Sequence, residues 1–176
     1  MPELWDLYDA RRNLTGRTHT RDHRLGDALQ PGDYHLVVHV WLLNSRGEFL
    51  IDQRSPEKDM FPLMWETCGG SALAGEDSLT AALREFREEI GIALLPERGK
   101  RVLTFRREDE RDFLDIWLFR QDVDPADFIP QPGETVQARF ATPEEILRMM
   151  DAGEFIRCPA SYEKELFAIA RNEVLS

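Results

Sequence analysis

The strongest constraint on the fold is a two-sided helical pattern at residues 78–90, which read SLTAALREFREEI. Four large apolar side chains recur at spacings of four, three and four residues: Leu79, Leu83, Phe86 and Ile90. At about 100° per residue these side chains fall within an arc of roughly 60°. Gly91 follows directly, in the position of a C-terminal cap. The pattern predicts an amphipathic helix that buries one face against the rest of the protein.

Three glutamates, Glu85, Glu88 and Glu89, share a similarly narrow arc on the opposite side of this helix. Like charges one turn apart destabilise a helix by a few tenths of a kcal/mol unless something neutralises them. A hard divalent cation such as Mg2+ or Mn2+ would do so, because it prefers oxygen ligands. Taken alone, the helix fits a solvated acidic face better than a metal site.

The glycines before the helix change that balance. Gly69, Gly70 and Gly75 bracket a short connection, which predicts a backbone that turns tightly and offers carbonyls to a metal. Residues 70–92 read GSALAGEDSLTAALREFREEIGI. This segment resembles the Nudix box, G-x5-E-x7-R-E-U-x-E-E-x-G-U with U apolar, and every fixed position is present. By this resemblance the chain is identified as a member of the Nudix superfamily.

The resemblance implies a metal centre. Glu85, Glu88 and Glu89 would ligate one or more Mg2+ (or Mn2+) ions, helped by a backbone carbonyl at Gly69 or Gly70. Such ions would bridge diphosphate oxygens, orient an attacking water and stabilise charge on the leaving phosphate. A carboxylate would accept the proton of the water, which makes Glu88 and Glu89 candidate catalytic groups as well as ligands.

Other acidic and basic positions receive roles from the same resemblance. Glu76 would lie in the outer shell or hold a second metal water, and Arg84 would orient the carboxylates through a salt bridge. Many Nudix enzymes carry a further acidic residue on a loop distant from the box. Glu134, just before a strand expected at 135–140, occupies a similar place, although an exposed turn residue is an equal interpretation. Competing candidates lie in another loop: Glu108, Asp109 and Glu110.

Outside the box the chain resembles the branch of the superfamily related to isopentenyl-diphosphate isomerase. The matching pieces are Tyr34-His35, Gln53-Arg54 followed by Lys58, and Phe61-Pro62 with Trp65. An isomerase-like enzyme is therefore the first alternative, and it needs a cysteine opposed to a glutamate. The family's cysteine falls at Gly69 here; Cys68 is one residue away, and a one-residue slip along a strand reverses the face. Together with the intact R-E-x-x-E-E, this favours hydrolysis.

The second alternative is a non-catalytic Nudix-like module that senses a nucleotide. Such modules usually have eroded boxes, and this box is complete. For a hydrolase, the implied substrate is a small diphosphate: a nucleoside diphosphate or triphosphate, or a nucleoside diphosphate joined to another group. The isomerase-like surroundings leave an isoprenoid or other small diphosphate open.

Candidate substrate-binding side chains are basic or aromatic. Arg54 and Lys58 are the primary candidates for phosphate contacts, although surface solvation is the default for such residues. Further basic and aromatic candidates are Arg106, Arg107, Trp41, Trp65 and Trp117. Trp41 and Trp117 lie within apolar strands and are more typical of a core.

The overall charge restricts the partners. The 176 residues carry 22 Lys and Arg against 33 Asp and Glu, a net charge of -11, so long nucleic acid is not an expected partner. Two cysteines suggest no disulfide framework and favour a reducing cytoplasm. The chain shows neither a signal-peptide pattern nor an apolar run of about 20 residues, so no membrane association is expected. Base rates of oligomer symmetry favour a homodimer.

The length predicts one domain spanning residues 1–176. Residues 1–33 form an arm or hairpin packed on a core at 34–142, and two helices close the chain at 143–176. Strands are expected at 35–44, 48–53, 101–107, 113–123 and 135–140, with irregular segments at 55–65 and 124–133. The closing helices begin after the N-cap Thr142 and near Ser161. The resemblance implies an α/β (α+β) fold: an α/β/α sandwich with a mixed central sheet.

Overall fold

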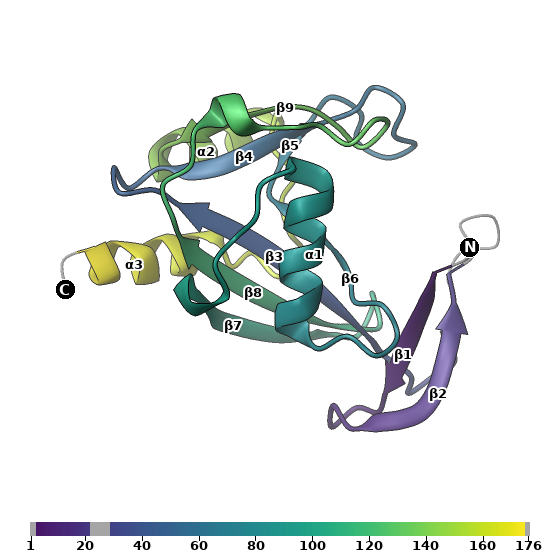
Figure 1. The fold of residues 1–176 in the computed structure, drawn as a ribbon. Helices are drawn as coiled ribbons and strands as arrows, with labels where there is room; N and C mark the ends of the chain where they lie inside the picture. Colours follow the sequence, from purple (N-terminus) through teal and green to yellow (C-terminus); the bar gives the residue numbers. More distant parts are fainter. Residues whose placement is uncertain (1–2, 22–28, 175–176) are drawn as a thin grey trace.

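The computed structural model describes residues 3–21 and 29–174 of the chain. Within these ranges, seven strands form one mixed sheet in the order β5-β4-β3-β8-β7, with β6 paired to β3 and β9 paired to β4 (Figure 1). The strands are β3 (His35–Leu43), β4 (Phe49–Arg54), β5 (Trp65–Glu66), β6 (Cys68–Ser71), β7 (Gly99–Arg107), β8 (Asp112–Arg120) and β9 (Thr135–Ala141). β3 and β8 run parallel, and the other pairs are antiparallel.

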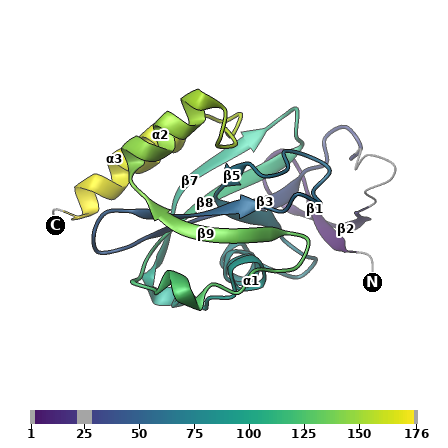
Figure 2. The same cartoon turned by 90° about the horizontal axis from the view of Figure 1, so that it is seen from above.

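Helices cover both faces of this sheet (Figure 2). Helix α1 (Ser78–Ile90) packs on one face, and α2 (Pro143–Ala152) and α3 (Glu163–Val174) pack on the other. The even-numbered residues of β3 face α1, whereas Trp41 and Leu43 face the C-terminal helices. The predicted α/β/α sandwich with a mixed sheet is therefore confirmed, with the box helix and the C-terminal helices on opposite faces.

Capping residues mark both ends of α1 and α2, including the predicted caps Gly91 and Thr142. Asp77 accepts a hydrogen bond from the Thr80 amide at 2.8 Å at the start of α1, and Gly91 ends the helix with a φ of 79°. Thr142 caps α2 through the Glu145 amide, and Gly153 ends it with a φ of 73°. The capping residues fix both the length and the direction of the helix that carries the glutamates.

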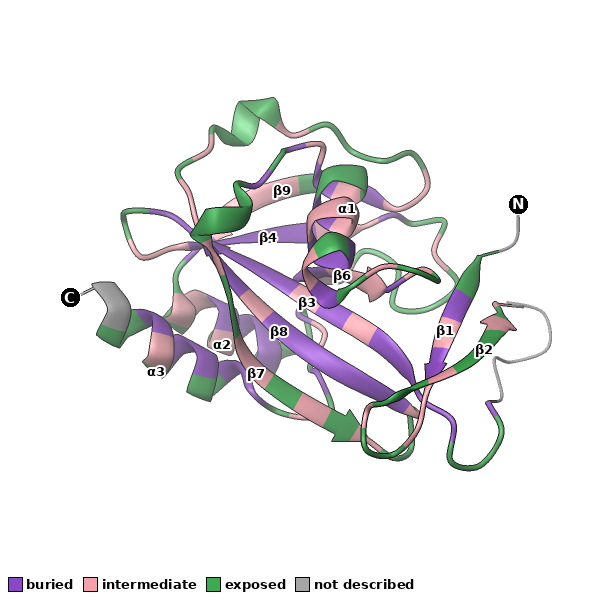
Figure 3. Ribbon diagram, turned by 60° about the horizontal axis from the view of Figure 1, so that its bottom comes forward, coloured by how far each residue is buried: buried purple, intermediate pink, exposed green. Residues whose placement is uncertain are grey.

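The buried face of α1 differs in part from the predicted stripe. Phe86 and Ile90 are buried, but Leu79 and Leu83 are only partly covered (Figure 3). The helix instead buries Ala81 and Ala82 completely, and their small side chains allow it to approach β3 and β6 closely. The direction of the apolar face was correctly predicted, whereas its centre lies nearer to the alanines.

The segment before α1 is a strand, where a tight turn was predicted. Residues 68–71 form β6, with Gly69 opposite His39 and Gly70 opposite Val38. A Cβ at Gly69 would lie 2.5 Å from the Val38 carbonyl oxygen, so close packing excludes a side chain here. Only Gly75 of the three glycines has a positive φ, 87°, and makes the expected turn.

The N-terminal segment forms a separate two-stranded sheet from β1 (Leu4–Tyr8) and β2 (Leu14–Thr20). Tyr8 and Tyr34 exchange backbone hydrogen bonds of 2.8 and 3.0 Å, which attach the hairpin to the start of the core. Elsewhere the predicted strands are confirmed, except that β8 ends at Arg120. The irregular segment at 124–133 contains one short 3-10 turn, Pro125–Asp127.

Both cysteines are free, buried thiols, and they lie on different cores of the sandwich. Cys68 belongs to the core beneath α1, and Cys158 belongs to the core beneath the C-terminal helices. Across the described ranges, none of the helices is long and apolar enough to cross a membrane.

Candidate active site

One cavity of about 360 Å3 contains most of the predicted site residues. It lies where α1, β6, the loop after β4 and the loop before β9 meet, with the end of the N-terminal hairpin on its rim. From the box, its lining includes Gly70, Arg84, Glu85, Glu88 and Glu89. From outside the box, it includes Arg54, Lys58 and Glu134. The cavity therefore combines an acidic wall on α1 with basic residues from the end of β4 and the loop after it.

Arg84 holds the acidic wall together. Its guanidinium donates to both oxygens of Glu76 at 2.7 and 2.9 Å, and it approaches Glu85 at 3.0 Å and Glu88 at 2.9 Å. It also donates to the Ser71 carbonyl at 3.0 Å. Burial lowers the pKa of Arg84, but the surrounding carboxylates outweigh it and raise the pKa. This fan of contacts is the geometry that a residue orienting several carboxylates requires.

Glu76 does not line the cavity. Its oxygens are engaged by Arg84, and one of them also accepts from the Leu73 amide at 2.9 Å. Burial works to raise its pKa, but the hydrogen bonds from Arg84 and Leu73 prevail and lower it. Such a carboxylate is committed to positioning Arg84 and the turn before α1. The predicted metal role of Glu76 stays a prediction, and the contacts favour a positioning role.

Glu85 lies against β6, at the glycine that the box requires. A Cβ at Gly70 would overlap the carboxylate of Glu85, so only a glycine leaves that carboxylate its place. The Glu85 side chain is 14% exposed, and burial raises its pKa. The backbone of Gly70 has an ordinary conformation, so a glycine is needed here for the space that it leaves to the Glu85 carboxylate.

Glu89 is the glutamate whose charge the surroundings disfavour most clearly. Burial first, and the neighbouring Glu85 second, raise its pKa to about 8. Two weak hydrogen bonds work against this rise: the Gly69 amide donates to Glu89 at 3.4 Å, and the Cys68 thiol also donates to it. In the absence of a cation, Glu89 is therefore poorly compensated as an anion.

The donor set fits a hard divalent cation. Three carboxylates face one cavity beside a glycine-lined strand, and burial raises the pKa of both Glu85 and Glu89. In the described part of the chain, no three acidic, His or Cys side chains already converge on a single ligating point. Arg84 contacts Oε1 of Glu85 and Oε2 of Glu88, and a carboxylate held through one oxygen can still bind a cation through the other.

The two basic side chains that line the cavity from the end of β4 and the loop after it each form an ion pair with a glutamate. Arg54 contacts Glu66 at 2.7 Å, and Lys58 forms an ion pair with Glu134. The pKa of Lys58 is lowered by burial and by the nearby charge of Arg54. Glu134 thus reaches the cavity from the loop before β9, as its position in the sequence suggested, and its carboxylate meets a lysine.

Other sequence candidates lie outside this cavity. Glu108 accepts from Tyr34 and contacts Arg106, and Arg107 pairs with Asp112. The three tryptophan candidates do not line it either: Trp41 is fully buried in the core, Trp117 donates to Ser78, and Trp65 faces Arg139. None of these residues is placed to contact a ligand held by the α1 glutamates.

Sequence reasoning missed several charged residues at the site. Glu66 lines the cavity from β5, and Asp52, its neighbour on β4, lies beneath with both carboxylate oxygens buried and without a described partner. Glu3 and Arg21 reach the same cavity from the N-terminal hairpin. The one available signal was the acidic Asp52 inside the otherwise apolar start of FLIDQR.

The sandwich, the glycine-lined strand and the glutamate-bearing helix define a Nudix domain. The family model named NUDIX domain matches residues 33–157, and the chain belongs to this family. It is 41% identical to an uncharacterized Nudix hydrolase of Listeria monocytogenes over 94% of both chains. It is 31% identical to an isopentenyl-diphosphate Delta-isomerase of Nocardia farcinica over 75% of this chain and 74% of that protein.

The fold comparison agrees. A crystal structure from Deinococcus radiodurans superimposes with a TM-score of 0.71 and 26% identity, covering 96% of this chain and 99% of the other. The prediction of an enzyme of the Nudix hydrolase class is confirmed, and the family as a whole acts on small molecules and generally depends on divalent metals.

Proposed function

We propose that the protein is a Mg2+-dependent (or Mn2+-dependent) hydrolase that cleaves a diphosphate linkage in a nucleoside diphosphate derivative or nucleotide. One observation carries this proposal: Glu85, Glu88 and Glu89 on α1 and the basic side chains of Arg54 and Lys58 line the same cavity. A ligand that combines divalent metal with diphosphate matches both sets of side chains at once. Localisation in the cytoplasm and a homodimer remain predictions.

The residues of the site have two kinds of role: some bind the cation and the diphosphate, and others accept the proton of the attacking water. Glu85, Glu88 and Glu89, beside the backbone of Gly70, would hold the cation, which supplies polarisation of the diphosphate and an activated water. Arg84 positions Glu85 and Glu88, and Glu76 positions Arg84. The proton of the attacking water passes to a cavity carboxylate; Glu88, Glu89 and Glu134 are the candidates. Arg54 and Lys58 bind the diphosphate oxygens.

Isomerisation of an isoprenoid diphosphate is the second candidate, and the identity to the Nocardia isomerase favours it. It requires a thiol at the reacting carbon. Among the described residues that line the cavity there is no cysteine: Cys68 is buried in the core beneath α1, from which its thiol hydrogen-bonds to Glu89. The position that faces the cavity is Gly69, which has no side chain.

A phosphate-release screen with Mg2+ and with Mn2+, over nucleoside diphosphates, triphosphates and nucleotide sugars, tests the proposal. Glu89→Gln should lower turnover by about 10²–10⁴-fold while circular dichroism stays unchanged. The matched control is Glu165→Gln on the exposed side of α3, which should retain full activity. Full turnover in Glu89→Gln would contradict the metal assignment.

The alternatives need two further assays. Interconversion of isopentenyl and dimethylallyl diphosphate that disappears in Cys68→Ala would favour the isomerase. Nucleotide binding without turnover under both metals would favour a sensor.

A further inference from the structure

The N-terminal hairpin contributes two charged side chains to the catalytic cavity. Glu3 lies just before β1 and Arg21 just after β2, and both line the cavity opened by the box residues. The Arg21 guanidinium donates to Glu3 at 2.8 Å, and its backbone amide donates to the Glu3 carbonyl at 2.9 Å. These residues lie outside the box and more than 40 positions before it, so the box does not account for them.

The hairpin is attached to the elements that carry the site. The Gly75 amide donates to the Asp6 carboxylate at 2.7 Å, and the Ala74 amide donates to the Leu4 carbonyl at 2.7 Å. Both donors belong to the connection that leads into α1. Because Leu4 and Asp6 lie on β1, which begins directly after Glu3, the hairpin end is held at a fixed position relative to the α1 glutamates.

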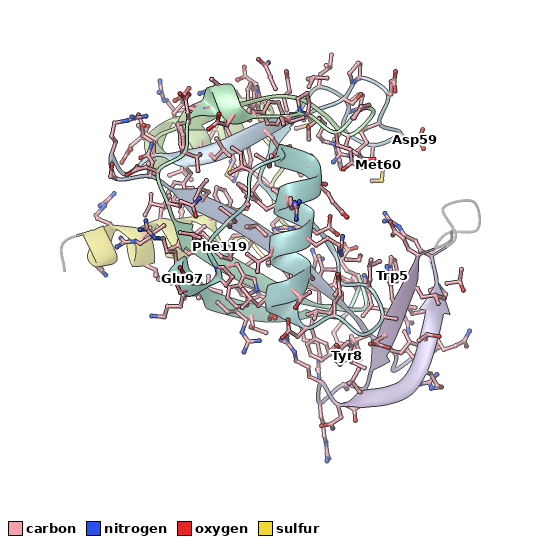
Figure 4. The ribbon with its side chains drawn as sticks, viewed as in Figure 1. Trp5, Tyr8, Asp59, Met60, Glu97 and Phe119 are labelled. Carbon is pink, nitrogen blue, oxygen red and sulfur yellow. The ribbon has the colours of Figure 1, made fainter. Side chains whose placement is uncertain are left out.

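Arg21 also rests on an aromatic support. Its guanidinium carbon lies 5.6 Å from the centroid of Trp5, and Trp5 in turn stacks on His35 at 4.2 Å with an interplanar angle of 8°. Figure 4 shows Trp5 on the hairpin and the loop residues Asp59 and Met60 on the same side of α1. Among the described residues, the buried Nε of Arg21 has no hydrogen-bond acceptor. Part of the donor capacity of this guanidinium is therefore unused.

The partner of Arg21 is the one most easily exchanged. The Arg21 and Glu3 side chains are 35% and 47% exposed, whereas Arg54 and Glu66 are 17% and 24% exposed. Exposed ion pairs contribute little to stability, so replacing Glu3 with another anion costs the fold little. The charges also act on the site: Arg21 helps to lower the pKa of Lys58 after burial and Arg54, and Glu3 adds slightly to the raised pKa of Glu85.

We propose that Arg21 binds a phosphoryl group of the substrate, exchanging Glu3 for phosphate oxygens, so that the N-terminal hairpin forms a wall of the active site. This inference rests on the proposed diphosphate hydrolysis. A guanidinium presents a planar fork of donors that matches phosphate oxygens, and its support on Trp5 fixes the plane of that fork. Glu3 is the resting partner that keeps the fork oriented before substrate arrives.

The first test separates binding from chemistry. Arg21→Met keeps the aliphatic stem over Trp5 but removes the fork, and it should raise KM about tenfold with kcat within about twofold. The KM of Arg21→Lys should lie between those of the wild type and Arg21→Met, because an ammonium group restores the charge without the planar fork of donors. Arg17→Met is the matched control: Arg17 lies on the same hairpin, pairs with Asp33 and does not line the cavity. It should leave both constants unchanged.

A second measurement does not need turnover. Calorimetric titration of methylenediphosphonate in the presence of Mg2+ should show about tenfold weaker binding to Arg21→Met than to Arg17→Met, at equal melting temperatures. If the wild type hydrolyses a diphosphate but Arg21→Met binds and turns over like Arg17→Met, the role of Arg21 is overturned and the hydrolase proposal stands. If no substrate is cleaved but Arg21→Met still weakens binding, the hydrolase proposal fails and the anion site stands. No binding to wild type overturns the inference.

Discussion

Two buried aspartates, Asp115 on β8 and Asp52 on β4, occupy the same kind of position in the sheet but have opposite surroundings. Their exposed fractions are 0% and 1%. Asp115 accepts hydrogen bonds from Arg12 at 2.5 and 2.8 Å and from Ser78 and Thr104 at 2.5 and 2.7 Å. Both oxygens of Asp52 lack a partner within the part of the chain that the structure describes.

The pKa values follow these surroundings. Burial works to raise the pKa of Asp115, but the hydrogen bonds from Arg12, Ser78 and Thr104 outweigh it and lower the pKa. Burial raises the pKa of Asp52 well above its usual range, and the nearby Glu66 and Glu89 raise it further. Buried polar groups are normally satisfied, and uncompensated ones gather at functional sites. The chain thus satisfies the carboxylate that ties the hairpin to the core and leaves the one beneath the cavity unsatisfied.

The largest effect is expected at Asp115. Asp115→Asn removes the charge that faces Arg12 in a buried ion pair, and breaking such a pair costs about 3 kcal/mol of unfolding free energy or more. For a chain of this size that corresponds to a fall in melting temperature of roughly 6–12 °C. Chemical denaturation with a constant m-value would measure it. A loss below about 1 kcal/mol would mean that Asp115 is not the structural partner its contacts indicate.

A change of pH should reveal the site carboxylates in the metal-free protein. The pKa of Glu89 rises from 4.5 to about 8 on folding, so the folded state binds more protons than the unfolded state between these values. Above about pH 6.5, where the buried His39 with its lowered pKa no longer opposes this effect, stability should therefore fall as pH rises to about 8, because an anion must be buried. Asp52, Glu66 and Glu85, whose pKa values are also raised, act in the same direction.

Melting curves across this range, recorded with chelator and then with Mg2+, would measure the effect. The slope should weaken in Glu89→Gln, and stabilisation by Mg2+ should grow with pH, because the cation binds the ionised carboxylates. A metal-free protein whose melting temperature rises steadily between about pH 6.5 and 8 would contradict the assignment.

Much of the fold was accessible from the sequence because local patterns and tertiary packing agree. The apolar run at 35–44 predicted β3, Gly91 predicted the end of α1, and Thr142 predicted the start of α2. β6 was missed, because glycine disfavours strands and the reason for its presence is a contact with Val38 on another strand. The hydrophobic periodicity of a sequence does not predict a close contact between the backbones of two strands.

The site was accessible only as far as one helix carries it. The three glutamates and Arg84 lie on consecutive turns of α1, so their spacing determines that they face one direction. Asp52, Glu66 and Arg21 come from β4, β5 and the hairpin, and they meet the helix only through the sheet order and the hairpin attachment. Residues that come together only through the order of the strands have no regular spacing in the sequence, so a sequence pattern cannot predict that they meet.

The smallest expected effect, and the sharpest test of the comparison, is Asp52→Asn. Burial raises the pKa of Asp52 well above its usual range and disfavours its charged form, so a neutral amide of the same shape changes little. The unfolding free energy should change by less than about 1 kcal/mol, and the change should become more favourable as pH rises. Denaturation of Asp52→Asn beside Asp115→Asn, without metal, makes the measurement. A loss at Asp52 equal to that at Asp115 would show that both aspartates are ionised and paired, and the distinction between structural and functional carboxylates in this sheet would fail.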